Sequence, residues 1–359
     1  MKRKLHNVEF LRFLFALGLV HYHLLRANLV SCAPDPGAYA RLADGCDWAC
    51  LLVECFCVLA GWFLPASAER SASKPFVEVF LDRFFRLWPV FAVATLVHAF
   101  FGLAPQTAAD QILLLHGVGL SPGGRGILWF VPPFFWANIF LLVLLRTADR
   151  KVAATLLGLV AFFGYAVNLG TTGGGLGRDV IWGFLSQGLL RVAAGMSLGA
   201  ILSMASDAFA RSFPKPEGNR TAATALFTLL EAAGLALLAK WLFFGHEGVR
   251  NPLVPVAVFS FAILLFANRA GWLSRLLDRP LFDRFGRYAY SIYVLQQVAF
   301  VLLAKTLWTR KAAFAARPVL FLVLSILLAT ALGVLAYHLV ERPALRRWIC
   351  WKNKRTRHP

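Results

Sequence analysis

Long apolar stretches separated by short polar segments repeat along the whole chain. Each stretch is near the ~20 residues that a helix needs to cross the hydrocarbon core of a bilayer. The pattern therefore predicts an all-α, polytopic integral membrane protein with about ten transmembrane helices. We place them at residues 8–30, 48–65, 88–104, 126–146, 152–168, 181–204, 222–245, 252–269, 285–306 and 318–340.

Composition and charge support this layout. The chain is 59% hydrophobic and only 15% charged, far from the composition of a soluble domain. Most of its 37 lysines and arginines fall in the connecting segments that the layout places in the cytoplasm, with both termini on that side. The formal charge of +19 is thus mainly an orientation signal. Because these charges are divided among short loops, we expect no nucleic-acid binding.

The layout gives one transmembrane domain over residues 1–345 and a basic cytoplasmic tail over residues 346–359. The tail could also contact anionic lipid headgroups. The first outer loop contains Cys32 and Cys46, which could form a disulfide in an oxidising periplasm. No spacing of residues typical of a metal site occurs, so we expect no metal.

A cation and a base share one face of the first span. Eleven positions separate Arg12 from His23, which is close to three full helical turns and about 16 Å along the axis. Ionisable groups are costly in hydrocarbon, so this pair is a functional-site hypothesis. His21 is about 200° away from His23 on the same helix, so the two cannot share a face. We expect His23 to be the base.

Other ionisable residues lie in or beside the apolar spans. Glu54 lies in the second span, where it could orient His23, bind an acceptor hydroxyl or simply form a structural ion pair. Arg83 and Arg86 lie three residues apart on one helix face, which suits phosphate oxygens but also simple membrane anchoring. Arg191, inside the sixth span, needs an anionic partner or ligand.

Small residues in two spans predict a close contact between helices. Ala60 and Gly61 follow one another in the second span, and Gly195 and Gly199 form a small-xxx-small face in the sixth. Such residues allow the backbones of neighbouring membrane helices to approach.

The fourth and ninth spans carry features expected to line a cavity. Pro132 and Pro133 should kink or break the fourth span, and Trp129 lies close to them. The ninth span is unusually polar for a membrane helix and contains Tyr293 and Gln296.

Taken in order, these features resemble the membrane-bound acyltransferase-3 family, bacterial O-acyltransferases that modify cell-surface glycans. The resemblance covers nearly the whole chain and is carried by FLRFLFALGLVHYH with Arg12 and His23, CFCVLAG after Glu54, the Arg83 to Pro89 segment, LWF at 128–130, Arg191 with Gly195, YSIYVLQQ, and the terminal Glu341, Arg342 and Pro343. Two positions depart from the family pattern. Ala60 stands where a serine is usual, and Gln296 stands where many members have histidine.

The resemblance implies a multi-pass protein of the bacterial inner membrane that uses acyl-coenzyme A as co-substrate, with acetyl as the expected group and no bound cofactor. The acceptor would be a hydroxyl of a carbohydrate or glycolipid. The roles implied are catalysis for His23 and Glu54, donor binding for Arg12, Arg83, Arg86 and Arg191, and acceptor or pocket lining for Trp129, Tyr293 and Gln296. The alternative is a transporter or flippase for a polar solute, because broken helices and buried charges also mark transport pathways.

Overall fold

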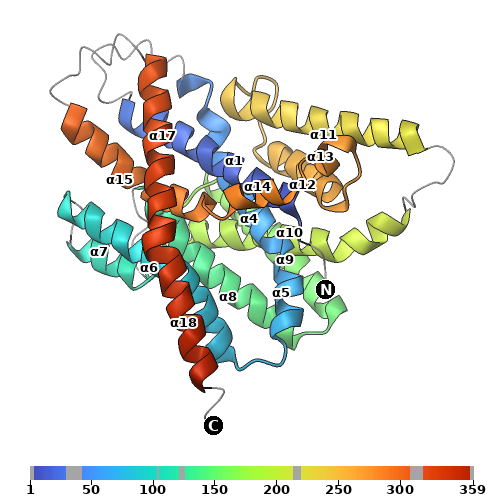
Figure 1. Cartoon of the computed structure of the whole chain (residues 1–359). Coiled ribbons are helices and arrows are strands. Elements are labelled where there is room, and N and C mark those ends of the chain that lie inside the picture. The colour runs from blue at the N-terminus through green and yellow to red at the C-terminus, as the bar shows by residue number, and fades with distance from the viewer. Residues whose placement is uncertain are drawn as a thin grey trace.

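The computed structural model describes residues 4–29, 43–102, 105–120, 126–212, 220–307 and 318–355. The helices of the first half are α1 (His6–His23), the π-helix η1 (Leu24–Leu29), the 3-10 helix η2 (Asp47–Leu51), α4 (Leu52–Trp62), α5 (Leu64–Ser71), α6 (Phe76–Phe100), α7 (Pro105–Ile112), the 3-10 helix η3 (Ile127–Phe130), α8 (Val131–Thr147) and α9 (Arg150–Thr171). Those of the second half are α10 (Gln187–Ser212), α11 (Arg220–Phe243), α12 (Leu253–Asn268), α13 (Trp272–Leu276), α14 (Pro280–Gly286), α15 (Ala289–Leu307), α17 (Pro318–Ala336), the π-helix η5 (Tyr337–Glu341) and α18 (Arg342–Arg355). Figure 1 shows this helical bundle.

The all-α membrane architecture is confirmed. Within the described residues, seven helical segments are long and apolar enough to cross a membrane: His6–Arg26, Asp47–Ser71, Ile127–Thr147, Arg150–Thr171, Gln187–Ser212, Ala222–Phe243 and Leu322–Lys354. The other three predicted spans are also helical, as parts of α6, α12 and α15. The total of ten crossings and the side that each terminus faces remain predictions.

The sixth span begins later than predicted. Residues 181–186 belong to a short antiparallel hairpin of β1 (Val180–Ile181) and β2 (Leu185–Ser186). Trp182 and Gly183 form its turn with positive φ angles of 52° and 79°. These backbone angles are incompatible with a right-handed helix, so α10 starts only after the hairpin.

The prolines of the fourth span begin a helix, and the predicted break is wrong. Pro132 and Pro133 lie in the first turn of α8, which then continues to Thr147. Backbone N–H groups in a first turn have no partner within the helix, so proline removes nothing there.

Helices α4 and α10 pack with their backbones in close contact, as the small residues predicted. A Cβ atom added to Gly61 would lie 1.9 Å from the carbonyl oxygen of Met196. One added to Gly199 would lie 2.0 Å from the carbonyl oxygen of Val58. Only glycine fits at these two points, so they set the distance between the helices.

We therefore expect Gly61→Ala to destabilise the protein by about 1–3 kcal/mol or more, because overpacking forces the two backbones apart. The loss should appear as a lower midpoint in thermal unfolding of the protein in nanodiscs. Gly158→Ala is the matched control, since a Cβ there meets nothing within 4 Å. Equal midpoints for the two variants would contradict the packing argument.

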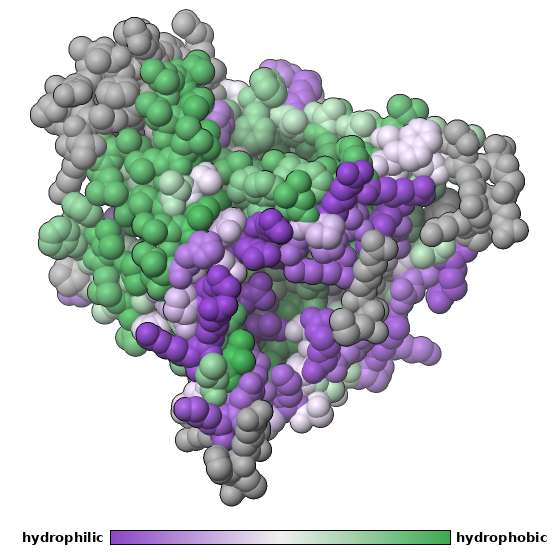
Figure 2. All heavy atoms as spheres, in the orientation of Figure 1, coloured by the Kyte–Doolittle hydropathy of each residue, from purple (hydrophilic) through white to green (hydrophobic). Residues whose placement is uncertain are grey.

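The surface agrees with a membrane setting. In Figure 2 a broad hydrophobic area covers α17 and α15, whereas hydrophilic residues gather over α14 and the lower part of α18.

The last helix continues α17 through η5, so the predicted domain boundary at residues 345 and 346 falls inside α18. Trp348 Nε1 donates to Asp82 Oδ1 at 2.7 Å, which fixes α18 against the start of α6.

Candidate active site

His23 is the last residue of α1, and its imidazole meets α15. Its Nδ1 lies 3.2 Å from Oε1 of Gln296, a side chain with no exposed surface. The amide of Gln296 is oriented in turn, because its Nε2 donates to the backbone oxygen of Tyr293 at 2.8 Å. Residues 273 positions apart thus form one hydrogen-bonded unit.

This unit selects the tautomer of the neutral imidazole. An amide oxygen can only accept, so Nδ1 of His23 must carry the proton and donate to Gln296. The other nitrogen, Nε2, is then the unprotonated one and can accept a proton. A general base needs that state.

Trp129 lies on η3, next to the same part of α15. The Tyr293 hydroxyl donates to the backbone oxygen of Ile127 at 2.5 Å and thereby holds η3 against α15. The Trp129 ring is itself buried, with the guanidinium carbons of Arg191 and Arg178 at 5.7 and 6.0 Å from its centre. Such distances suit cation–π contact. The structure therefore joins Trp129 and Tyr293 to the His23 region.

Glu54 does not contact His23 through any interaction seen in the described residues, and the predicted orienting role falls to Gln296. One oxygen of Glu54 accepts from Nε of Arg191, and the other accepts from the Tyr165 hydroxyl at 2.8 Å. Both members of the ion pair are buried. Glu54 therefore forms the structural ion pair that the sequence left open, and it is also the anionic partner that Arg191 was expected to need.

Arg191 does more than neutralise Glu54. Its Nη1 donates to the carbonyl oxygen of Leu176 at 3.1 Å and its Nη2 to that of Cys50 at 3.4 Å. One buried guanidinium thus connects α4, α10, η2 and the loop after α9.

Two of the four basic residues expected to bind the donor contact α5 or the residue just before it. The Arg12 guanidinium lies over the ring of Phe63, 5.5 Å from its centre, and pairs with Glu9 at 2.9 Å. Arg83 donates through Nη2 to the hydroxyl of Ser67. Phe63 immediately precedes α5, and Ser67 lies four residues later, one turn along the same side of this segment. Arg12 and Arg83 therefore contact the same short segment, although they come from different helices.

Arg83 has unused capacity for an anion. Its Nε is buried and has no hydrogen-bond partner among the described residues. It lies on the part of α6 that precedes the apolar stretch, where burial, and then the charge of Arg86, lower its pKa to about 10. The group stays protonated at pH 7, so a bound anion would relieve an unfavourable environment. Arg86 is exposed one turn further on.

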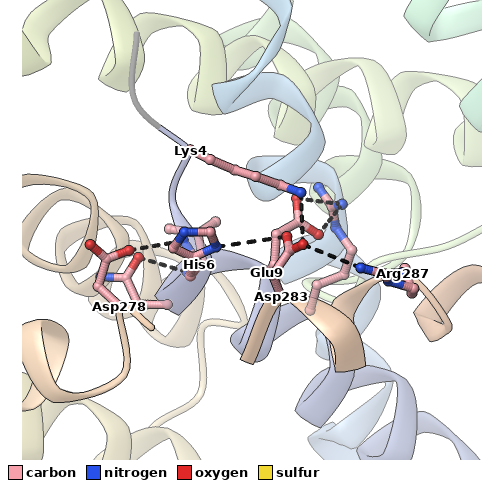
Figure 3. A network of polar contacts seen from close by, with 9 residues as sticks. Lys4, His6, Glu9, Asp278, Asp283 and Arg287 are labelled. Carbon is pink, nitrogen blue, oxygen red and sulfur yellow. Dashed lines mark hydrogen bonds and ion pairs between the residues drawn. The ribbon is translucent and has the colours of Figure 1, made fainter. Parts of the chain in front are cut away.

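A network of ion pairs anchors the start of α1, the helix that carries Arg12. Lys4 Nζ lies 2.7 Å from Asp283 Oδ2 on α14, and Arg287 lies 3.6 Å from the same oxygen. Figure 3 shows Asp283 between these two cations, with Glu9 beside it. The network fixes α1 on α14 and so positions Arg12.

Sequence reasoning missed two residues of the site. Tyr165 could have been noticed as a hydroxyl in the otherwise apolar fifth span, whereas Arg178 lies in a loop and gave no local signal. His21 faces away from Gln296, with Nε2 3.5 Å from Sγ of Cys46, as the helical geometry predicted. The proposed partner of Cys46 in a disulfide, Cys32, lies outside the described residues.

A family model described as an acyltransferase domain matches residues 5–338. No curated protein and no solved structure matches the chain.

Proposed function

Because the chain belongs to the acyltransferase-3 family, we propose that it moves an acyl group, with acetyl as the expected group, from cytoplasmic acyl-coenzyme A to a hydroxyl of a cell-surface or exported carbohydrate or glycolipid. The observation that carries the proposal is the contact between His23 and Gln296, which leaves the outer imidazole nitrogen unprotonated.

The reaction follows from that state. Nε2 of His23 takes the proton of the acceptor hydroxyl as its oxygen attacks the thioester carbonyl carbon. The carbon–sulfur bond then breaks, and coenzyme A leaves as a thiolate that receives the proton from His23. The products are an ester of the acceptor and free coenzyme A.

The donor is proposed to bind at the other end of α1. Arg12, Arg83 and Arg86 would hold its phosphates, because guanidinium groups offer forks of donors that match phosphate oxygens. Arg12 precedes His23 by about 16 Å along the helix, so the thioester arm of the donor would run beside α1 toward the imidazole. Arg191 is left out of this role, because its three guanidinium nitrogens already bind Glu54 and the carbonyl oxygens of Leu176 and Cys50.

The orientation completes the proposal. We place both termini in the cytoplasm of a bacterium and the protein in its inner membrane, so the arginines face the pool of acyl-coenzyme A. This placement rests on the distribution of lysine and arginine between the loops.

The test uses the full chain in nanodiscs with radiolabelled acetyl-coenzyme A and a mixed extract of envelope glycans. We expect loss of thioester and appearance of label in the glycans, with neither in empty nanodiscs. A solute carrier would consume no thioester. Absence of both signals, combined with passage of unmodified glycan into liposomes that contain the protein, would replace this proposal by transport.

The donor site gives a separate prediction. Arg83→Ala should raise the KM for acetyl-coenzyme A by about tenfold or more, because a charge-assisted hydrogen bond contributes about 1.5–3 kcal/mol. Acetyl-pantetheine lacks the phosphates, so its weak turnover should be unchanged. Arg347→Ala, which removes an exposed cation from α18, is the control. Equal losses with both donors would place Arg83 outside a phosphate site.

A further inference from the structure

A cavity of about 640 Å³ lies beside η2, the short helix that packs against α1. Its walls are η2 with the residues just before it, the glycine-rich loop after α9, and the loop between α11 and α12. The volume is within the ~300–1,000 Å³ typical of small-molecule sites.

The cavity is built onto the proposed catalytic region. Cys50 and Leu176 line it, and the buried guanidinium of Arg191 binds the carbonyl oxygens of both. On its other side, η2 is tied to α1 and η1, because Arg26 pairs with Asp47. The walls are therefore fixed by the elements that position His23.

The lining has two aromatic rings in a rigid arrangement. Trp48 and His246 are stacked with ring centres 3.9 Å apart and planes within 6° of parallel, and both line the cavity. A flat ring held in this way can pack against the apolar C–H face of a sugar ring, and its N–H can still donate a hydrogen bond.

Charged groups beside the rings complement hydroxyl groups. Asp44, Glu247 and Arg250 line the cavity, and none of them forms an ion pair with another described residue. Carboxylates accept from hydroxyl donors, and a guanidinium donates to hydroxyl oxygens. The lining contains two carboxylates and one guanidinium, so its formal charge is negative and disfavours an anion.

We infer that this cavity binds the acceptor, and that the unit it takes is an uncharged saccharide rather than an acidic sugar. That the ligand is the acceptor rests on the proposed function. That it is an uncharged saccharide rests on the residues that line the cavity. A hydroxyl of the bound unit would then approach His23 from the end of α1 opposite the donor arginines.

The experiment measures equilibrium binding without any donor. Tritium-labelled oligosaccharides from an envelope polysaccharide extract are divided by anion exchange into a neutral and an acidic fraction. Each is bound to the full chain in nanodiscs. We expect the neutral fraction to bind at least tenfold more tightly than the acidic one, and Trp48→Ala to weaken that binding at least tenfold. Trp48→Phe keeps a flat ring and should retain most of it.

Two further variants keep the result interpretable. Trp182→Ala removes a tryptophan that is 68% exposed on the β1–β2 hairpin and outside the cavity lining, so it should bind like the natural protein. Glu247→Gln removes one carboxylate and should reduce the difference in affinity between the neutral and the acidic fraction. Unchanged binding in Trp48→Ala, or no preference for the neutral fraction, would overturn the inference.

The same protein is then given labelled acetyl-coenzyme A. Neutral oligosaccharides that bind through Trp48 but never receive label would refute the proposed function and leave the cavity as a saccharide site. If Trp48→Ala transfers label with full activity at low acceptor concentration, the cavity is not the acceptor site, and the proposed function still stands.

Discussion

Replacing His23 by alanine is expected to lower acyl transfer by about 10²–10⁴-fold, the usual contribution of a general base. The loss is expected because the hydrogen bond to Gln296 leaves one nitrogen of His23 unprotonated, and that nitrogen is the proposed base. The KM for acyl-coenzyme A should change little, since the proposed donor site lies about 16 Å away along α1. Rates of thioester consumption with saturating donor and glycan measure the effect.

Gln296 gives this prediction a sharper form. Gln296→Leu removes the oxygen that holds the Nδ1 proton, so we expect a smaller loss of turnover, about 10-fold to 100-fold, by analogy with supporting residues around metal-bound histidines. In a protein that already carries His23→Ala, Gln296→Leu should cause no further loss of turnover, because the effects of residues that act as a unit are not additive. Additive losses would mean that Gln296 acts independently of the imidazole.

His21→Ala is the matched control for the base. It removes an imidazole from the same helix and the same depth, but one that contacts Cys46 instead of Gln296. Turnover close to that of the natural protein is expected. A loss equal to that of His23→Ala would show that the assay reports damage to the end of α1.

The second large effect is on stability. Glu54→Ala should destabilise the protein by about 3–5 kcal/mol, because it leaves the buried charge of Arg191 without its partner. Tyr165 would lose its acceptor as well. The free energy of unfolding in a titration with sodium dodecyl sulfate measures the change. Removing Arg191 too, as in Glu54→Ala with Arg191→Met, should recover part of the loss.

An exposed ion pair provides the comparison. Lys74 and Glu78 are four residues apart and their nitrogen and oxygen lie 3.4 Å from one another near the surface. Lys74→Ala should cost at most about 0.5 kcal/mol, as usual for such pairs.

Glu54→Gln separates a structural from a catalytic role of Glu54, because the folded fraction of this variant should still transfer acyl groups. A stable but inactive Glu54→Gln protein would restore Glu54 to a catalytic role.

Part of the site was predictable from sequence because it depends on one helix at a time. Arg12 and His23 share a face by periodicity alone, and His21 is excluded by the same argument. The pairs of small residues in α4 and α10 predicted a close approach, since backbone contact needs residues without bulky side chains. The prolines of α8 misled because their effect depends on where a helix begins, and that was decided by the 3-10 helix before it.

Hydropathy and periodicity predict an all-α membrane protein with basic groups and a histidine in its apolar spans, because both are local properties that the chain carries wherever it packs. Which polar groups contact one another depends on how the helices pack. Glu54 pairs with Arg191 across 137 residues, and His23 bonds to Gln296 across 273. The reason is that contacts between distant helices follow from how their surfaces fit, at points such as Gly61 against Met196, and no local pattern encodes that fit.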